Sequence, residues 1–153
     1  SVTCLDEDGE IRSHPSGGLN AQYRSIPDLA HNFVLQAVFE GSPCAREEIE
    51  EKLEDARAKR RLSQPSGASA GCIFKNPEEI PAGKLIDELG LKNACVGDAC
   101  VSSVHANFII NRGHARARDI TILIDMIRKE AMENRGIDLK SEAQVIGDRE
   151  PQF

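Results

Sequence analysis

The chain has 153 residues, the length of one ordinary domain or of a small domain with part of another. Hydrophobic residues make up 40% of it but aromatic residues only 4%, and tryptophan is absent, so we expect a core of aliphatic side chains. The net charge of -6 at pH 7 argues against a protein that binds nucleic acid or an anionic membrane surface, since both need a basic face.

The N-terminal third of the chain is predicted to form β-strands. Residues 2–5 and 10–12 flank an acidic turn that contains Asp8-Gly9, and Asp-Gly between apolar runs predicts a β-hairpin. A second apolar run at 33–39 is rich in β-branched and aromatic residues and stops at Gly-Ser-Pro, which predicts another strand. Three strands alone are few for a stable sheet, so we expect this part to pair with further chain.

A helix is predicted over residues 42–62, with Pro43 suited to the first helical position. Its apolar residues recur at helical spacing and place Ile49, Leu53 and Ala56 on one face amid charges, which predicts an amphipathic helix. Residues 63–71 follow as a loop of small residues, and we place the boundary between two domains there.

The remaining elements mix helices and strands. Gly90 and Gly136 each follow an apolar helical pattern and are expected to end a helix. The predicted order is a helix at 82–89, a strand at 105–110, a long helix over 120–131 and a short strand at 145–146. This order predicts an α+β fold without the regular alternation of a doubly wound sheet.

The segment 64–77 is the first candidate for chemistry. Its small residues would let the backbone approach a ligand, and turn amides can bind a phosphate, although a surface linker has the same composition. Cys72 and Lys75 share the spacing of a Ser-x-x-Lys acyl-transfer pair, but the other elements of that enzyme class are missing.

The five cysteines, an odd number, are scattered along the chain and do not form the framework of a secreted disulfide-rich module. We therefore expect a reducing cytoplasm, and no run of about 20 apolar residues predicts a membrane span. A small zinc-binding module is an alternative, with Cys95, Cys100, His105 and His114 as ligands. Their spacing differs from that of the common structural zinc sites.

Several motifs, in order, carry a resemblance to a known family. They are the hairpin at 5–11, Tyr23-Arg24-Ser25, the helix ending Lys59-Arg60-Arg61 before Gln64-Pro65, and the segments 69–77, 82–86, 96–99, 105–111 and 142–147. Together they resemble the UDP-N-acetylenolpyruvylglucosamine reductases, and the resemblance spans nearly the whole chain. Ordered motifs are more specific than any one of them.

The resemblance implies an activity, cofactors and a domain plan. The family uses NADPH to reduce bound FAD, which then reduces UDP-N-acetylglucosamine enolpyruvate to UDP-N-acetylmuramate for peptidoglycan. It implies that 1–65 is the C-terminal portion of an FAD-binding domain, 66–141 the substrate-binding domain, and 142–153 a final strand and tail returning to the FAD domain. We expect FAD binding to need the N-terminal half of the enzyme as partner, so that this chain alone would not hold the cofactor. A fragment that binds a UDP-sugar without redox activity is the alternative.

The resemblance also implies roles for individual residues. Cys72, where the family commonly has Ser, is the expected proton donor, Glu142 the second acid or charge-stabilising group, and Arg24 the cation beside the substrate carboxylate. A thiol is a far stronger acid than an alcohol, so proton donation survives the change. The further residues expected to bind substrate are Tyr23, Lys75, Asn76 and His105.

Overall fold

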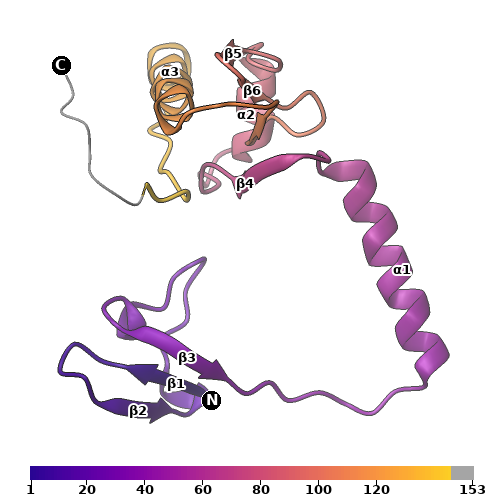
Figure 1. Ribbon diagram of the computed structural model, residues 1–153, viewed down its shortest axis with the longest axis vertical. Helices are drawn as coiled ribbons and strands as arrows, with labels where there is room; N and C mark the ends of the chain where they lie inside the picture. Colours follow the sequence, from indigo (N-terminus) through magenta and orange to yellow (C-terminus); the bar gives the residue numbers. More distant parts are fainter. Residues whose placement is uncertain (146–153) are drawn as a thin grey trace. The chain divides into compact units, whose positions relative to one another are not determined.

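The computed structural model describes residues 1–145, and these divide into two compact units. The first unit is Ser1–Glu48 and the second begins at Ile49 (Figure 1). The division falls inside a helix rather than in the small-residue loop at 63–71, and the domain boundary expected at 65/66 stays a prediction. No helix within residues 1–145 is both long and apolar enough to cross a bilayer.

The first unit is a three-stranded antiparallel sheet. It contains β1 (Val2–Leu5), β2 (Ile11–His14) and β3 (Phe33–Ala37), in the order β2-β1-β3. The carboxylate of Asp6 closes the β1–β2 turn by accepting hydrogen bonds from the N–H groups of Asp8 (3.1 Å) and Glu10 (2.8 Å). The Glu10 bond is the main cause of the lowered pKa of Asp6. The predicted hairpin and strand are both confirmed.

This sheet leaves most of its apolar side chains uncovered. Cys4 is the buried hydrophobic residue of the unit, whereas Phe33 is 73% and Phe39 is 89% exposed. Every residue of β3 is exposed. Residues 1–48 therefore present strand-forming apolar side chains that have no core of their own to fill.

Helix α1 (Arg46–Ser63) forms where a helix is predicted, and the apolar residues of its amphipathic face are exposed. Ile49 is 44% and Leu53 is 48% exposed, and no residue of α1 is buried. The helix begins with acidic residues and ends with basic ones, as its dipole favours, and Arg61 pairs with Glu54 at 2.6 Å.

The second unit is built on a four-stranded antiparallel sheet. Its strands are β4 (Ala68–Cys72), β5 (Cys95–Val96), β6 (Ala99–Val101) and β7 (Phe108–Asn111), in the order β4-β7-β6-β5. Two predictions are corrected here. The loop expected at 63–71 contains the start of β4, because Ala68 and Ser69 pair with β7, and the strand expected from His105 begins only at Phe108.

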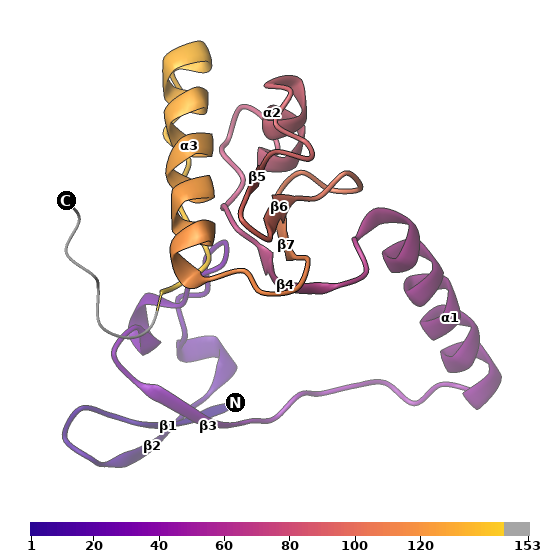
Figure 2. The ribbon, with the colours of Figure 1, turned by 45° about the horizontal axis from the view of Figure 1, so that its top comes forward.

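Helices α2 (Ala82–Glu88) and α3 (Ala117–Arg135) complete the second unit (Figure 2). Both form near the predicted positions, and Gly136 ends α3 in the left-handed conformation at φ +66°. Val145 is not part of a strand, and Ile146, the other residue of the predicted final strand, lies outside the described residues.

The core of this unit lies on one face of the sheet. It joins strand residues such as Val101 and Ile109 to residues of both helices and of the last described segment. Its buried members are Ile73, Phe74, Ala82, Leu85, Ile86, Ala99, Val101, Ala106, Ile109, Leu123, Ile124, Ile127, Ala131 and Leu139. The fold is thus α+β with two antiparallel sheets and three α-helices over residues 1–145, and the expected aliphatic core is confirmed for this unit.

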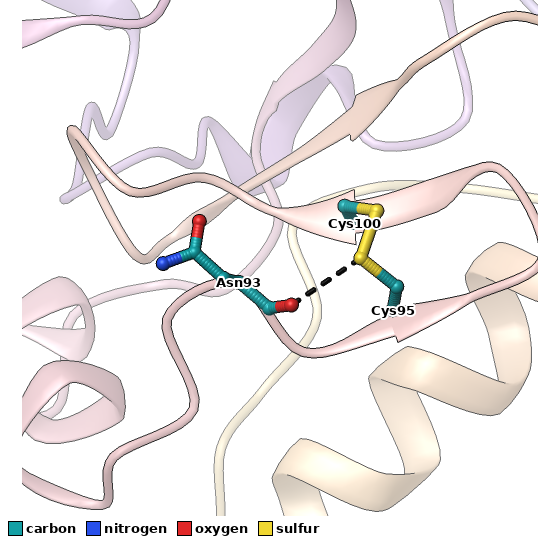
Figure 3. Close-up of a disulfide and its surroundings, with 3 residues drawn as sticks. All are labelled: Asn93, Cys95 and Cys100. Carbon is teal, nitrogen blue, oxygen red and sulfur yellow. Dashed lines mark hydrogen bonds between the residues drawn. A yellow bond between two sulfur atoms is a disulfide. The ribbon is translucent and has the colours of Figure 1, made fainter.

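The β5–β6 hairpin contains a disulfide that the sequence did not predict. Cys95 and Cys100 face each other in the register of the two strands, and their sulfur atoms are bonded (Figure 3). A single disulfide is not the framework of a secreted module, so the expectation stated for the cysteines is unaffected by this pair. Scattered spacing along a chain does not reveal a cross-strand pair, because a tight hairpin brings residues five apart into contact.

Removing this disulfide should lower stability by a moderate amount. A bridge that closes so short a loop is worth about 2 kcal/mol on chain-entropy arguments. We expect Cys95→Ser/Cys100→Ser to lose about that free energy of unfolding, measured by urea denaturation against the oxidised chain. Cys44→Ser, which changes an exposed cysteine outside the disulfide, should leave the urea midpoint unchanged. Equal midpoints for the double variant and the oxidised chain would contradict the expectation.

Candidate functional site

The sheet of the second unit has a face opposite its core, and Cys72 belongs to it. Directly paired residues of antiparallel strands point to the same side, and Cys72 is paired with Phe108. Ser69 pairs with Ile110, and Ile110 with Cys100. The core residues Val101 and Ile109 alternate with these along β6 and β7 and so point the other way. We call this second side the outer face.

Cys72 is the last residue of β4 and is half-buried. The register of β4 against β7 shifts between Ser69 and Cys72, which marks a bulge. Gly71, inside the bulge, has φ +82°, a conformation that favours glycine. Bulges re-aim a side chain, and this one sets the direction of Cys72 at the end of the strand.

The backbone brings Glu142 next to Cys72. The N–H of Glu142 donates a 2.7 Å hydrogen bond to the carbonyl of Ile73, and Ser141 forms an antiparallel bridge with Phe74. The Oε2 atom of Glu142 is buried. Two residues 70 positions apart in the sequence, both expected in the chemistry, thus lie on adjoining backbone segments.

Asn107 is a site residue that the sequence reading missed. It is only 2% exposed, and its side chain makes two hydrogen bonds with the backbone of Phe74. Its Oδ1 accepts from the Phe74 N–H at 2.9 Å, and its Nδ2 donates to the Phe74 carbonyl at 2.8 Å. Its backbone carbonyl accepts from the Ile73 N–H. A polar residue inside the apolar run Ala106–Ile109 was the signal that could have revealed it.

Three further predicted residues cluster around the start of α2. Asn76 is exposed, and its Oδ1 accepts a 3.0 Å hydrogen bond from the Ala82 N–H. Lys75 precedes it and donates its N–H to the Lys140 carbonyl. His105 stacks edge-on against Phe108, with ring centroids 5.0 Å apart. Since Phe108 is also the partner of Cys72, the ring contact connects this cluster to the candidate proton donor.

Gly83 in α2 leaves no room for a side chain beside His105. A Cβ built on Gly83 would lie 2.7 Å from Cε1 and 3.1 Å from Nδ1 of that ring. The Nδ1 atom also accepts a hydrogen bond from the Asn107 N–H at 3.2 Å. The ring is therefore held between α2 and the segment before β7.

Gly83→Ala should displace the His105 ring. Overpacking of this kind typically costs about 1–3 kcal/mol, so we expect a lower melting temperature and a shifted ring-proton resonance of His105. Gly41→Ala is the matched control, because a Cβ there meets nothing within 4 Å. An unmoved His105 resonance in Gly83→Ala would contradict the packing described here.

Tyr23 and Arg24 form a turn in the first unit. Gln22 and Ser25 exchange backbone hydrogen bonds of 2.8 and 3.2 Å across it. Arg24 has φ +53°, a conformation uncommon for a residue with a side chain, and its guanidinium carbon lies 5.7 Å from the centroid of the Tyr23 ring. Backbone outliers of this kind cluster at functional sites, which fits the expectation that Tyr23 and Arg24 belong to the site.

The four candidate zinc ligands do not gather into one group in the described residues. The sulfur atoms of Cys95 and Cys100 are bonded to each other, so neither is available as a thiolate ligand. No three His, Cys, Asp or Glu side chains of residues 1–145 gather in a way that would hold a metal ion.

A hollow on the outer face has a volume of about 240 Å³. It is lined by Pro65, Ser66, Cys100, Val101, Ser102, Ser103, Val104, Ile110 and Arg112. Pockets that enclose even a drug-sized ligand measure about 300–1,000 Å³. The hollow is therefore too small to enclose a flavin dinucleotide.

Known proteins are similar to this chain in sequence and in fold. A family model described as UDP-N-acetylenolpyruvoylglucosamine reductase, C-terminal domain, matches residues 63–146. The reductase of Syntrophus aciditrophicus is 37% identical over 149 residues, which cover 97% of this chain and 48% of that protein. The reductase of Chlamydia felis is 39% identical over 153 residues, covering 99% and 51%. The crystal structure of the Thermus caldophilus reductase superposes with a TM-score of 0.78 at 33% identity, covering 94% of this chain and 51% of that one.

The fold and the matching sequences define the class: an α+β unit of the kind that forms the C-terminal part of these reductases. The chain belongs to the UDP-N-acetylenolpyruvoylglucosamine reductase family. It spans about half the length of the curated relatives it matches. The resemblance read from the sequence motifs is confirmed.

Proposed function

We propose that this chain is the substrate-binding and proton-donating half of a cytoplasmic, NADPH-dependent flavoenzyme that reduces UDP-N-acetylglucosamine enolpyruvate to UDP-N-acetylmuramate. Membership of the family supports the reaction. The observation that carries the division of labour is the hydrogen bond from the Glu142 N–H to the Ile73 carbonyl, which holds both candidate acids on adjoining segments. FAD and NADPH belong, in this proposal, to the complete enzyme.

Cys72 supplies the proton. Reduction of the alkene adds a hydride to one carbon and a proton to the other, and reduced flavin supplies the hydride when it is bound. The Cys72 thiol gives its proton to the carbon adjacent to the carboxylate, and the resulting thiolate is reprotonated from solvent. Its place at the end of β4 on the outer face leaves it accessible from one side.

Arg24 and Glu142 act on the charge that develops in the substrate. A guanidinium stays charged and can hold a carboxylate through two hydrogen bonds, so Arg24 binds the substrate carboxylate and stabilises the enolate. Glu142, with one carboxyl oxygen buried, acts as the second acid. Tyr23 lies beside Arg24 in its turn and contacts the same end of the substrate.

The cluster at the start of α2 binds the nucleotide end. Lys75 supplies a positive charge to the diphosphate, and the amide nitrogen of Asn76 can donate to it while its Oδ1 accepts from Ala82. His105 completes the cluster.

The proposed partner is the N-terminal half of the same enzyme. The relatives contain as much chain again as the part matched here. The uncovered apolar side chains of the first unit fit a role in completing a larger sheet or domain, because such side chains are rarely left exposed together. Its exposed large residues are Ile11, Tyr23, Phe33, Val34, Leu35, Val38 and Phe39.

Co-expression tests the proposal. We expect the chain produced alone to be colourless, and the chain produced with the N-terminal half of the Syntrophus aciditrophicus reductase to purify as a yellow complex that oxidises NADPH when substrate is added. Calorimetry with UDP on the chain alone separates the alternative: binding of UDP with no activity in the complex would favour a UDP-sugar-binding fragment. Neither binding nor activity would reject both.

A further inference from the structure

The outer face carries, besides Cys72, a second sulfur centre that the proposed reaction does not use. Cys100 pairs with Ile110 on this face, and Cys95 pairs with Cys100 at its edge. The disulfide therefore lies on the same side of the sheet as Cys72, with β7 between them. Cys100 also lines the hollow described above.

The hairpin that the disulfide closes lies at the edge of the sheet, where Val96 of β5 is only partly buried against the core. Strand β5 is two residues long and forms the edge of the sheet. Beyond the strand pairing itself, Asn93 and Ala94 exchange backbone hydrogen bonds of 3.0 and 2.8 Å with Val101. The disulfide adds a covalent link between β5 and its neighbour to these contacts.

The two sulfur atoms differ in access. Cys95 is exposed, whereas Cys100 is 3% exposed. In Figure 3 the Cys95 sulfur points toward the Asn93 carbonyl oxygen, 3.3 Å away. In the oxidised form that sulfur carries no hydrogen, so reduction would create a thiol that can donate to this oxygen. In the reduced state the Cys95 thiol can therefore donate a hydrogen bond to the Asn93 carbonyl oxygen.

We propose that Cys95 and Cys100 form a reversible redox pair whose disulfide holds the β5–β6 hairpin in place at the edge of the sheet and thereby strengthens the binding of a UDP-nucleotide to the second unit. The thiolate of a small dithiol attacks the Cys95 sulfur, and the electron pair of the broken bond goes to Cys100, which takes up a proton. The second thiol of the reductant then releases Cys95 as a thiol and leaves as a cyclic disulfide. Reoxidation by a low-molecular-weight disulfide runs by the same exchange and yields two small thiols.

The proteins of reducing compartments rarely keep disulfides for stability, and those present there are usually redox-responsive. The cytoplasmic setting is part of the function proposed above, and the ligand-binding arm of this inference rests on that function. The response of the hairpin to reduction does not rest on the proposed function.

The test uses the full chain, oxidised with glutathione disulfide or reduced with dithiothreitol, with peptide mapping of thiol labels at Cys95 and Cys100. We expect reduction to increase amide exchange at Asn93 and Val101 at least tenfold and to raise the dissociation constant for UDP about three- to tenfold. Cys95→Ser/Cys100→Ser should match the reduced chain in both redox conditions, and Cys44→Ser should respond as the unchanged chain does.

The outcomes separate the two proposals. If UDP does not bind in either state, the proposed function fails, and the exchange of Asn93 and Val101 alone then decides the present inference. Unchanged exchange on reduction overturns it, as does failure of the two thiols to reoxidise with glutathione disulfide. Faster exchange with an unchanged dissociation constant overturns the link to ligand binding.

Discussion

In the complex with the N-terminal half, Cys72→Ala should lose about 10²- to 10⁴-fold in turnover, the range that general acid catalysis contributes. The methyl group cannot donate a proton, while the hydride donor is untouched. We expect NADPH to reduce the flavin at the rate of the unchanged complex, and substrate to reoxidise it slowly. Stopped-flow absorbance of the flavin separates the two half-reactions.

Cys72→Ser is the informative control, because it keeps a proton on a side chain of similar size. It should retain turnover within about a hundredfold, since a positioned weaker acid still preserves part of a contribution of this kind. Cys44→Ser, which changes a thiol of the first unit, should behave as the unchanged complex. Full turnover by Cys72→Ala would remove Cys72 from the mechanism and leave Glu142 as the candidate proton donor.

Local patterns predicted most of the elements of this fold. The Asp8-Gly9 turn, the apolar run from Phe33 and the spacing of apolar residues in α3 each determine their structure over a few residues, because turn geometry and helical periodicity are local. Burial was harder to predict. Both α1 and α3 show apolar residues at helical spacing, but those of α1 are fewer and exposed, whereas Leu123, Ile124 and Ile127 of α3 belong to the core.

The sequence named residue types for the candidate site, which stay a prediction, and it could not give their arrangement. Cys72 and Glu142 come together through a bridge between Phe74 and Ser141, a contact of high sequence separation that no local pattern encodes. The β5–β6 hairpin escaped prediction because its strands are two and three residues long, too short to show alternation. The Cys95–Cys100 disulfide was not predicted either, because the hairpin that places the two cysteines opposite each other was not predicted.

The second large effect is expected from a substitution of Asn107, and it concerns the free energy of unfolding. Asn107→Leu keeps the approximate volume but removes both partners of Phe74, leaving its backbone N–H and carbonyl buried and unsatisfied. Each such group costs about 1–3 kcal/mol, so the free energy of unfolding should fall by roughly 2–6 kcal/mol. Urea denaturation with the slope compared between variants measures it.

Asn134→Leu is the matched control, since that amide is exposed on α3 and bonds only to Glu130 of its own helix. Its effect should stay within about 0.5 kcal/mol, as for most surface substitutions. The two variants make the same chemical change, so a difference between them isolates the two hydrogen bonds with the backbone of Phe74. If they prove equally stable, water or a shifted backbone satisfies Phe74, and the segment after Cys72 is held by the Glu142 and Lys75 hydrogen bonds instead.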